Sequence, residues 1–152
     1  MSDWHAFADR ETLDQALAAH VASRLQQGIA AREASHLVVS GGSTPIQLFS
    51  ILADADIEWG RVVVLLADER WVPVDHEDSN ERLVRETLLT GKAKSAKFLS
   101  LLPTPDDEIT NIADLSTLLG SLPSFDVVIL GMGEDAHTAS LFPCATALRE
   151  GL

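Results

Sequence analysis

Three short apolar runs, each followed at once by glycines or charged side chains, constrain the fold of this chain more than any other feature. The runs cover residues 36–40, 61–67 and 125–130. The second run is apolar almost throughout, which is typical of a parallel strand buried on both faces. Segments with helical spacing of apolar residues lie between the runs. Strands that alternate with helices in this way predict an α/β fold with a parallel sheet.

Helical periodicity is clearest near the start of the chain. In the segment 11–33, Leu13, Leu17, Val21 and Leu25 recur at intervals of four, and Thr12 is the expected N-cap. The remaining predicted elements are helices over 44–53, 80–89 and 109–119 and a further strand over 97–101. We therefore predict one domain over residues 1–152, with a Rossmann-like, mostly parallel sheet and helices on both faces.

The polar motifs of the chain follow the three apolar runs directly. In open parallel sheets, ligands bind beyond the carboxyl ends of the strands. Because 36–40, 61–67 and 125–130 would all end at the same edge of the sheet, we expect their polar motifs to meet there.

Composition excludes several classes of partner. The formal net charge is -12, which argues against nucleic acid, because binding to a phosphate backbone needs a basic surface. Cys144 is the only cysteine, so no internal disulfide is expected. The N-terminal segment carries no secretory signal pattern, and no run approaches the roughly 20 apolar residues of a membrane span. We expect a cytoplasmic protein without a membrane partner.

The first motif joins a strand to a helix with the sequence Ser40-Gly41-Gly42-Ser43-Thr44. Glycines expose backbone N–H groups, hydroxyls add donors, and the following helix N-terminus carries partial positive charge. Together these groups suit an anion such as phosphate. An ordinary strand-to-helix turn with a hydroxyl cap explains the motif equally well.

The second motif places Asp68, Glu69 and Arg70 directly after a predicted strand. Buried charges at the rim of a sheet are costly unless they are paired or used on a ligand. The guanidinium of Arg70 offers a fixed fork for a phosphate or a developing oxyanion. A structural ion pair with Asp68 or Glu69 is the alternative.

Acidic residues and His76 follow Arg70, but we do not interpret them as a metal site. Ser79 or Asn80 as the N-cap of the next helix accounts for much of the polarity of this segment. His76 is interpreted as a solvated loop histidine.

The third motif contains Gly131, Gly133, Asp135 and His137. Its G-x-G-x-x-A pattern matches a dinucleotide fingerprint, but it follows a late strand and Pro143 interrupts the helix that should come next. Histidine exchanges a proton near neutral pH, so His137 is the candidate general base. Asp135 is placed to orient the imidazole; a carboxylate that caps the glycine turn is the alternative.

Taken together, the three motifs resemble those of the 6-phosphogluconolactonase family. The matching segments are Ser40-Gly41-Gly42-Ser43-Thr44-Pro45, Asp68-Glu69-Arg70-Trp71-Val72-Pro73 with Ser79-Asn80, and Gly131-Met132-Gly133 with Asp135 and His137-Thr138-Ala139-Ser140-Leu141-Phe142-Pro143. The resemblance covers essentially the whole chain. Aminosugar-phosphate isomerase/deaminases are similar in fold, but they usually carry Asp-Glu-Tyr where this chain has Asp68-Glu69-Arg70 and continue differently after the histidine.

The resemblance implies hydrolysis of the δ-lactone of 6-phosphogluconate in the oxidative pentose phosphate pathway, without metal or organic cofactor. It implies catalytic roles for His137, Asp135 and Arg70. The implied substrate-binding residues are Gly41, Gly42, Ser43, Thr44, Asp68, Arg70, Gly131 and Gly133. An aminosugar-phosphate isomerase/deaminase and a non-catalytic phosphosugar-binding module are the alternatives.

Two departures from the family pattern bear on activity. Ala136 stands where the family usually has glycine, beside the presumed base. Members of the family normally continue well beyond the position of Leu152, so the sheet is expected to be truncated at its C-terminal side. A fragment, a truncated gene product and a homo-oligomer that covers the exposed sheet edge are the three explanations left open.

Overall fold

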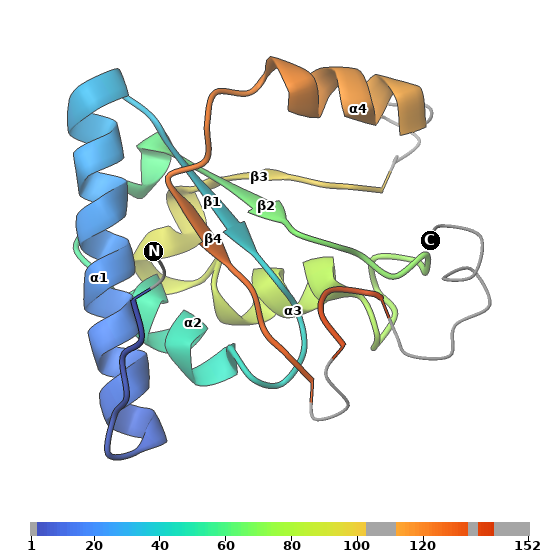
Figure 1. Ribbon diagram of the computed structural model, residues 1–152. Helices are drawn as coiled ribbons and strands as arrows, with labels where there is room; N and C mark the ends of the chain where they lie inside the picture. Colours follow the sequence, from blue (N-terminus) through green and yellow to red (C-terminus); the bar gives the residue numbers. More distant parts are fainter. Residues whose placement is uncertain (1–2, 103–111, 134–136, 142–152) are drawn as a thin grey trace.

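The computed structural model describes residues 3–102, 112–133 and 137–141 of the chain (Figure 1). In chain order, the elements are α1 (Arg10–Arg32), β1 (Ser35–Val39), α2 (Ile46–Ala53), the 3-10 helix η1 (Trp59–Arg61), β2 (Val62–Leu66), α3 (Asn80–Thr87), the 3-10 helix η2 (Gly91–Ser95), β3 (Lys97–Leu99), α4 (Ile112–Ser121) and β4 (Val127–Ile129). The predicted strands and helices are confirmed, with ends that coincide or differ by at most three residues where the structure describes them.

The described strands form one parallel sheet in the order β3-β2-β1-β4. Five residue pairs join β1 to β2, from Ser35 opposite Val62 to Val39 opposite Leu66. Three pairs join β1 to β4, from Leu37 opposite Val127 to Val39 opposite Ile129. Along the chain, strands are added outward from β1 to β3, and β4 is then added on the other side of β1. The loops that follow β1 and β4 therefore diverge.

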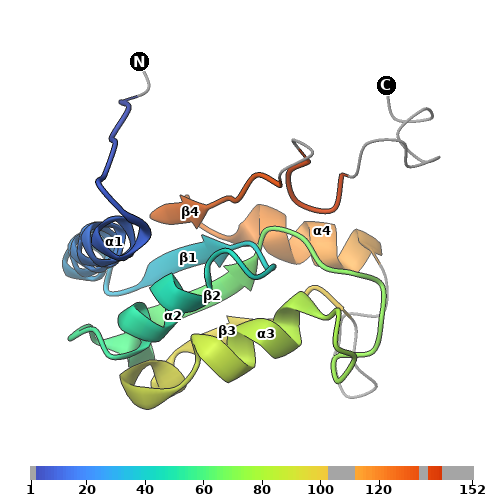
Figure 2. The ribbon, with the colours of Figure 1, turned by 90° about the horizontal axis from the view of Figure 1, so that it is seen from below.

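Helices cover both faces of this sheet, as predicted. Helices α1, α2 and α3 lie on one side, where α1 packs against α2 and α2 against α3, and α4 lies on the other side (Figure 2). This placement follows from right-handed crossovers, because the direction of travel across the sheet reverses between β3 and β4.

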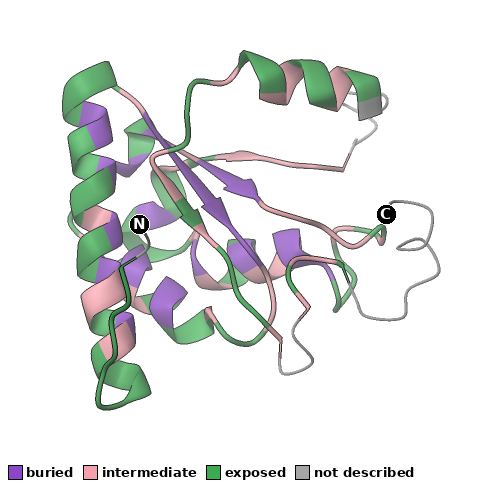
Figure 3. Cartoon of the chain, in the orientation of Figure 1, coloured by how far each residue is buried: buried purple, intermediate pink, exposed green. Residues whose placement is uncertain are grey.

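The main core lies between the sheet and the first three helices (Figure 3). All five residues of β1 are buried, and so are four of the five residues of β2. Val21 and Leu25 of α1 and Phe49 of α2 are fully enclosed. The four-residue spacing in α1 therefore marks its buried face correctly. In β4, by contrast, Val128 is 50% exposed, and this edge strand is much less enclosed than β1.

Two sequence interpretations of helix starts need correction. The N-cap of α1 is Asp9, whose carboxylate accepts a hydrogen bond from the backbone N–H of Thr12 at 2.8 Å, so Thr12 lies inside the helix. The second helix begins at Ile46, and Pro45 precedes its first residue. Aspartate and threonine are both favoured caps, and the hydrophobic spacing does not distinguish between neighbouring candidates. Of the two candidate caps of α3, Ser79 and Asn80, the structure selects Ser79, whose hydroxyl accepts a hydrogen bond from the backbone N–H of Arg82.

Asp126 fixes the start of β4 against β1 and α1. Its carboxylate accepts hydrogen bonds from the backbone N–H of His36, at 2.9 Å, and from the guanidinium of Arg32. Gly28 of α1 leaves room for this carboxylate, since a Cβ at that position would lie 2.5 Å from Asp126 Oδ1. Burial raises the pKa of Asp126, but these two donors outweigh burial, so its pKa lies below the usual value.

We expect the folded chain to lose stability in weak acid because of His36, whose imidazole lies near Asp126. His36 is 5% exposed, and its burial lowers its pKa below the ordinary 6.5, with Asp126 opposing this effect and Arg32 adding to it. The unfolded chain therefore binds a proton at a pH where the folded chain does not. Stability from the neutral imidazole is present above about pH 6.5 and is lost as the pH falls below it.

Urea unfolding at about pH 7.5 and 5.5, on either side of the ordinary histidine value, measures this effect. We expect His36→Leu to flatten the change in unfolding free energy between the two pH values, whereas His20→Gln, at an exposed site on α1, preserves it. Equal pH dependence in His36→Leu and the parent chain would contradict the assignment.

Within the described residues, no helix combines the length and apolar character needed to cross a membrane.

Candidate active site

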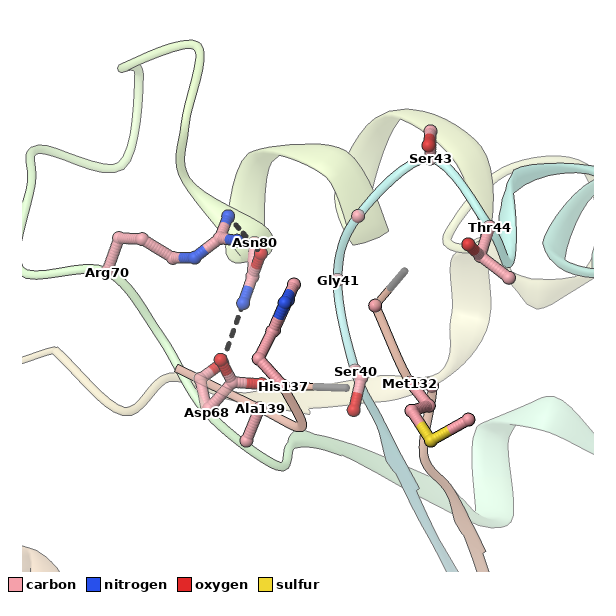
Figure 4. Close-up of a pocket in the computed structure, with 13 residues that line it drawn as sticks. Ser40, Gly41, Ser43, Thr44, Asp68, Arg70, Asn80, Met132, His137 and Ala139 are labelled. Carbon is pink, nitrogen blue, oxygen red and sulfur yellow. Dashed lines mark hydrogen bonds between the residues drawn. The ribbon is translucent and has the colours of Figure 1, made fainter. Parts of the chain in front are cut away.

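Polar loops after β1, β2 and β4 surround one cavity of about 420 Å³ (Figure 4). It lies beyond the carboxyl ends of the strands, where the loops after β1 and β4 diverge. Parallel sheets bind ligands at such a position. The lining residues are Ser40, Gly41, Gly42, Ser43, Thr44, Asp68, Arg70, Asn80, Gly131, Met132, Gly133, His137 and Ala139.

The loop after β1 requires its two glycines for different reasons. Gly42 has φ +88, in the left-handed region that side chains rarely adopt. Gly41 is constrained by a neighbour instead, because a Cβ there would lie 1.8 Å from the Oδ1 atom of Asn80. The loop then leads into α2, whose N-terminal end contributes partial positive charge next to the cavity.

Helix α1 holds the outer side of this loop. The guanidinium of Arg10 donates a hydrogen bond to the backbone carbonyl of Thr44, and its Nε donates to Asp14 at 3.0 Å. Asp14 is only 2% exposed, so it keeps Arg10 in a fixed direction. An arginine thus lies beside the anion loop of a chain whose net charge is strongly negative.

Glu69 has a structural role in the loop after β2. Its carboxylate accepts hydrogen bonds from the backbone N–H groups of Asn80 and Glu81, both at 2.8 Å, and from the Ser79 hydroxyl at 3.1 Å. It also accepts from the backbone N–H of Arg70 at 2.7 Å. These bonds satisfy donors at the start of α3 and place a negative charge at its positive end. The loop and the helix are therefore fixed to one another.

Arg70 is held by neutral acceptors. Its Nη1 atom donates to the carbonyl of Asp78 and to Asn80 Oδ1, each at 3.0 Å. Among the described residues, Arg70 forms no ion pair with Asp68 or Glu69, so the alternative of a structural ion pair is wrong. The Nε atom of Arg70 is buried and has no hydrogen-bond partner within the described part of the chain. Arg70 therefore retains both its charge and a donor for a ligand.

The loop after β4 is tied to the loop after β2. The Ser140 hydroxyl donates to the carboxylate of Asp68, and the Thr138 hydroxyl donates to the Gly131 carbonyl at 3.1 Å. The backbone N–H of Gly133 donates to the His137 carbonyl at 2.9 Å. These bonds hold the backbone on both sides of His137, and its imidazole points toward the space between the first two loops (Figure 4).

Three buried polar atoms around the cavity lack a partner among the described residues: Ser40 Oγ, Asp68 Oδ1 and Arg70 Nε. Buried polar groups are normally hydrogen-bonded, so their grouping here indicates a ligand or ordered water. Ala139, two residues after His137, has φ +53, a conformation that is uncommon outside glycine and concentrates at functional sites. The cavity therefore combines anion donors, one guanidinium, one carboxylate and one imidazole.

The structure brings together nearly all the predicted site residues. Gly41, Gly42, Ser43, Thr44, Asp68, Arg70, Gly131, Gly133 and His137 line the cavity. Asp135 and Ala136 lie outside the described residues, as does Cys144. His76 is exposed and does not line the cavity, in agreement with its interpretation as a loop residue.

Sequence reasoning missed three contributors, namely Arg10, Asn80 and Ser140. The four-residue spacing of Arg10 and Asp14 is visible in the sequence and typical of a helical pair. Whether Arg10 reaches Thr44, however, depends on how α1 packs, which the spacing does not show. Asn80 was considered as a helix cap and as part of the family-like Ser79-Asn80 segment, and no local pattern indicates its contacts to the loops after β1 and β2.

In the described part of the chain, no three side chains of the metal-binding types His, Cys, Asp and Glu form a group that could hold a metal ion.

Comparison with known proteins supplies a family. A family model described as "Glucosamine-6-phosphate isomerases/6-phosphogluconolactonase" matches residues 8–151. The chain is 45% identical to a 6-phosphogluconolactonase of Pseudomonas putida over 97% of its own length and 61% of that protein, and 46% identical to one of Mesorhizobium japonicum over 97% and 63%. Its fold matches a crystal structure of a 6-phosphogluconolactonase from Shewanella baltica OS155 with a TM-score of 0.85, at 46% identity, over 96% of this chain and 63% of that one. The chain thus spans somewhat under two thirds of each of these relatives.

Proposed function

Because this chain belongs to the glucosamine-6-phosphate isomerase/6-phosphogluconolactonase family, we propose that it hydrolyses 6-phospho-D-glucono-1,5-lactone to 6-phosphogluconate. Relatives that share 45% and 46% of its sequence carry the name 6-phosphogluconolactonase. The observation that carries the proposal is the convergence of the glycine loop, Arg70 and His137 on one cavity.

In the proposed reaction, the loop 41–44 holds the phosphate of the substrate. Backbone N–H groups at the start of α2 and the loop hydroxyls provide donors for its oxygens. This anchor positions the lactone carbonyl near His137, so that the hydrolysed bond has a fixed place in the cavity. Arg10 adds a positive charge behind the loop and favours the bound dianion.

His137 then acts as a general base on a water molecule. It takes one proton, the resulting hydroxide attacks the carbonyl carbon, and a tetrahedral oxyanion forms. Arg70 and backbone N–H groups of the glycine loop stabilise this oxyanion. As the intermediate collapses, the bond between the carbonyl carbon and the ring oxygen breaks, and His137 returns the proton to that oxygen. The product is the open-chain acid, and no electron leaves or enters the system.

The other assignments belong to the same proposal. Asp135 orients His137, and Asp68, Gly131 and Gly133 contact the substrate. The reaction needs neither metal nor organic cofactor. The proposed substrate is a dissolved phosphosugar lactone, so we place the reaction in the cytoplasm, without a nucleic-acid partner. We also propose a single domain over residues 1–152 and a homo-oligomer that covers the exposed edge of the sheet.

The direct test is an activity assay on the 152-residue chain. Freshly generated lactone is mixed with the protein in a stopped-flow instrument, and acid release is followed with correction for spontaneous opening. Hydrolysis above the spontaneous rate supports the proposal. Ammonia release from glucosamine 6-phosphate would replace it with aminosugar-phosphate deamination, and binding of 6-phosphogluconate without turnover would reduce it to a phosphosugar-binding module.

A further inference from the structure

Asn80 occupies an unusual place for the first residue of a helix. It is 2% exposed, yet it lines the cavity together with the loops after β1, β2 and β4. Its backbone N–H donates to Glu69 at 2.8 Å, so the backbone of Asn80, and not its side chain, fixes the start of α3. The amide group is therefore available for another task.

That amide is bonded to two residues of the loop after β2 in a defined orientation (Figure 4). Oδ1 accepts a hydrogen bond from Arg70 Nη1, and Nδ2 donates to the backbone carbonyl of Asp68, each at 3.0 Å. A reversed amide would point N–H groups at a guanidinium and an oxygen at a carbonyl, and both contacts would repel. The chemistry of the two partners thus permits one orientation only.

The same oxygen also limits the approach of the glycine loop. A Cβ on Gly41 would overlap Asn80 Oδ1 at 1.8 Å, so the backbone of Gly41 lies directly against the amide. Through this oxygen, Asn80 contacts both the glycine loop and the cationic side chain of the site.

We propose that Asn80 is a positioning residue that holds the Arg70 guanidinium and the Gly41 backbone in a fixed relation, so that both act on the same anionic ligand. This inference rests on the proposed function for the identity of the ligand, a sugar-acid phosphate. In this role Asn80 acts through Arg70, whose buried Nε atom has no partner in the described residues. A freely rotating arginine would lose entropy on each binding event.

A double-mutant cycle tests this role. Affinity for 6-phosphogluconate is measured by calorimetry for the parent chain, Asn80→Ala, Arg70→Ala and the double variant. We expect Asn80→Ala to weaken binding by roughly 3- to 100-fold, the range of coupling between contacting residues, and to have little further effect once Arg70 is alanine. Additive losses would overturn the proposal.

Val84→Ala is the matched control for general destabilisation. Val84 is fully buried in α3, and its side chain does not line the cavity. This variant should lower the free energy of unfolding without changing affinity.

Asn80→Asp keeps the shape of the side chain and the acceptor for Arg70 but loses the donor to the Asp68 carbonyl. Its negative charge also compensates the positive charge of Arg70. We therefore expect this variant to bind anions more weakly while the guanidinium stays ordered.

A second measurement tests the positioning role of Asn80 independently of turnover. The nitrogen NMR signal of Arg70 Nε reports how rigidly the guanidinium is held. We expect high order in the parent chain and in Val84→Ala, and lower order in Asn80→Ala, where only the Asp78 carbonyl remains as an acceptor for Arg70 Nη1 among the described residues. Unchanged order in Asn80→Ala would overturn the positioning role even if no ligand bound. Absence of lactone hydrolysis, with this pattern intact, would instead overturn only the proposed function.

Discussion

Replacing His137 by alanine is expected to lower the rate of lactone hydrolysis by about 10²–10⁴-fold, the usual contribution of a positioned general base. The imidazole lines the cavity, and the adjoining backbone is held by the Gly133 and Thr138 bonds and by Ser140. No other histidine lines this cavity in the described part of the chain. Affinity for 6-phosphogluconate should change much less than turnover, because in the proposed mechanism the glycine loop, and not His137, holds the phosphate.

The measurement is acid release at constant pH under saturating lactone, with the spontaneous rate subtracted. His20→Ala is the matched control, since this histidine is exposed on α1 and its replacement favours the helix. A rate for His137→Ala equal to that of the control would remove His137 from catalysis. Equal losses in affinity and turnover would assign it to binding instead.

Replacing Gly41 by alanine is expected to produce the largest effect in the glycine loop. The new Cβ would overlap the amide of Asn80, which cannot withdraw because Arg70 and the Asp68 carbonyl hold it. Forcing an extra methyl group into such a packed place costs about 1–3 kcal/mol of unfolding free energy. Anion binding should fall as well, because the loop or Asn80 must move.

Urea unfolding and 6-phosphogluconate binding measure the two effects. Gly60→Ala is the matched control, because a Cβ at that position meets no atom within 4 Å and no positive φ is involved. Gly42→Ala separates steric overlap from backbone strain: its Cβ also meets open space, but its φ of +88 makes the left-handed conformation cost roughly 1–2 kcal/mol. A Gly41→Ala variant as stable as Gly60→Ala would contradict the observed packing.

Much of the fold was predictable because the strands of the sheet can be recognised in the order of apolar residues along the sequence. Buried parallel strands leave continuous apolar runs, and 61–67 and 125–130 both contain the strands that the structure shows. Strand order was not predicted, since it depends on where each crossover packs. Helix starts were less certain for a local reason: Asp9 and Thr12 are both good caps, and only the geometry of the chain that enters α1 selects Asp9.

The candidate site was predictable where its functional residues belong to short motifs of consecutive residues. Gly41, Arg70 and His137 each stand out in their own motif, and the convergence of parallel strand ends brings them together. Asn80 was not found because its contacts connect it to loops 10 and 39 residues earlier in the chain, at Arg70 and Gly41. Glu69 was considered as a partner of Arg70, whereas its acceptor atoms face the backbone of α3.

The sheet order divides the site into parts of unequal local stability. The loops that would hold the anion follow β1 and β2, which share five residue pairs at the centre of the sheet. His137 follows β4, an outer strand joined to β1 by three pairs and half-exposed at Val128. Edge segments with few buried contacts open locally at lower free-energy cost than central ones. Within the described sheet, transient detachment of β4 would therefore move His137 away from the cavity while leaving the glycine loop and Arg70 assembled.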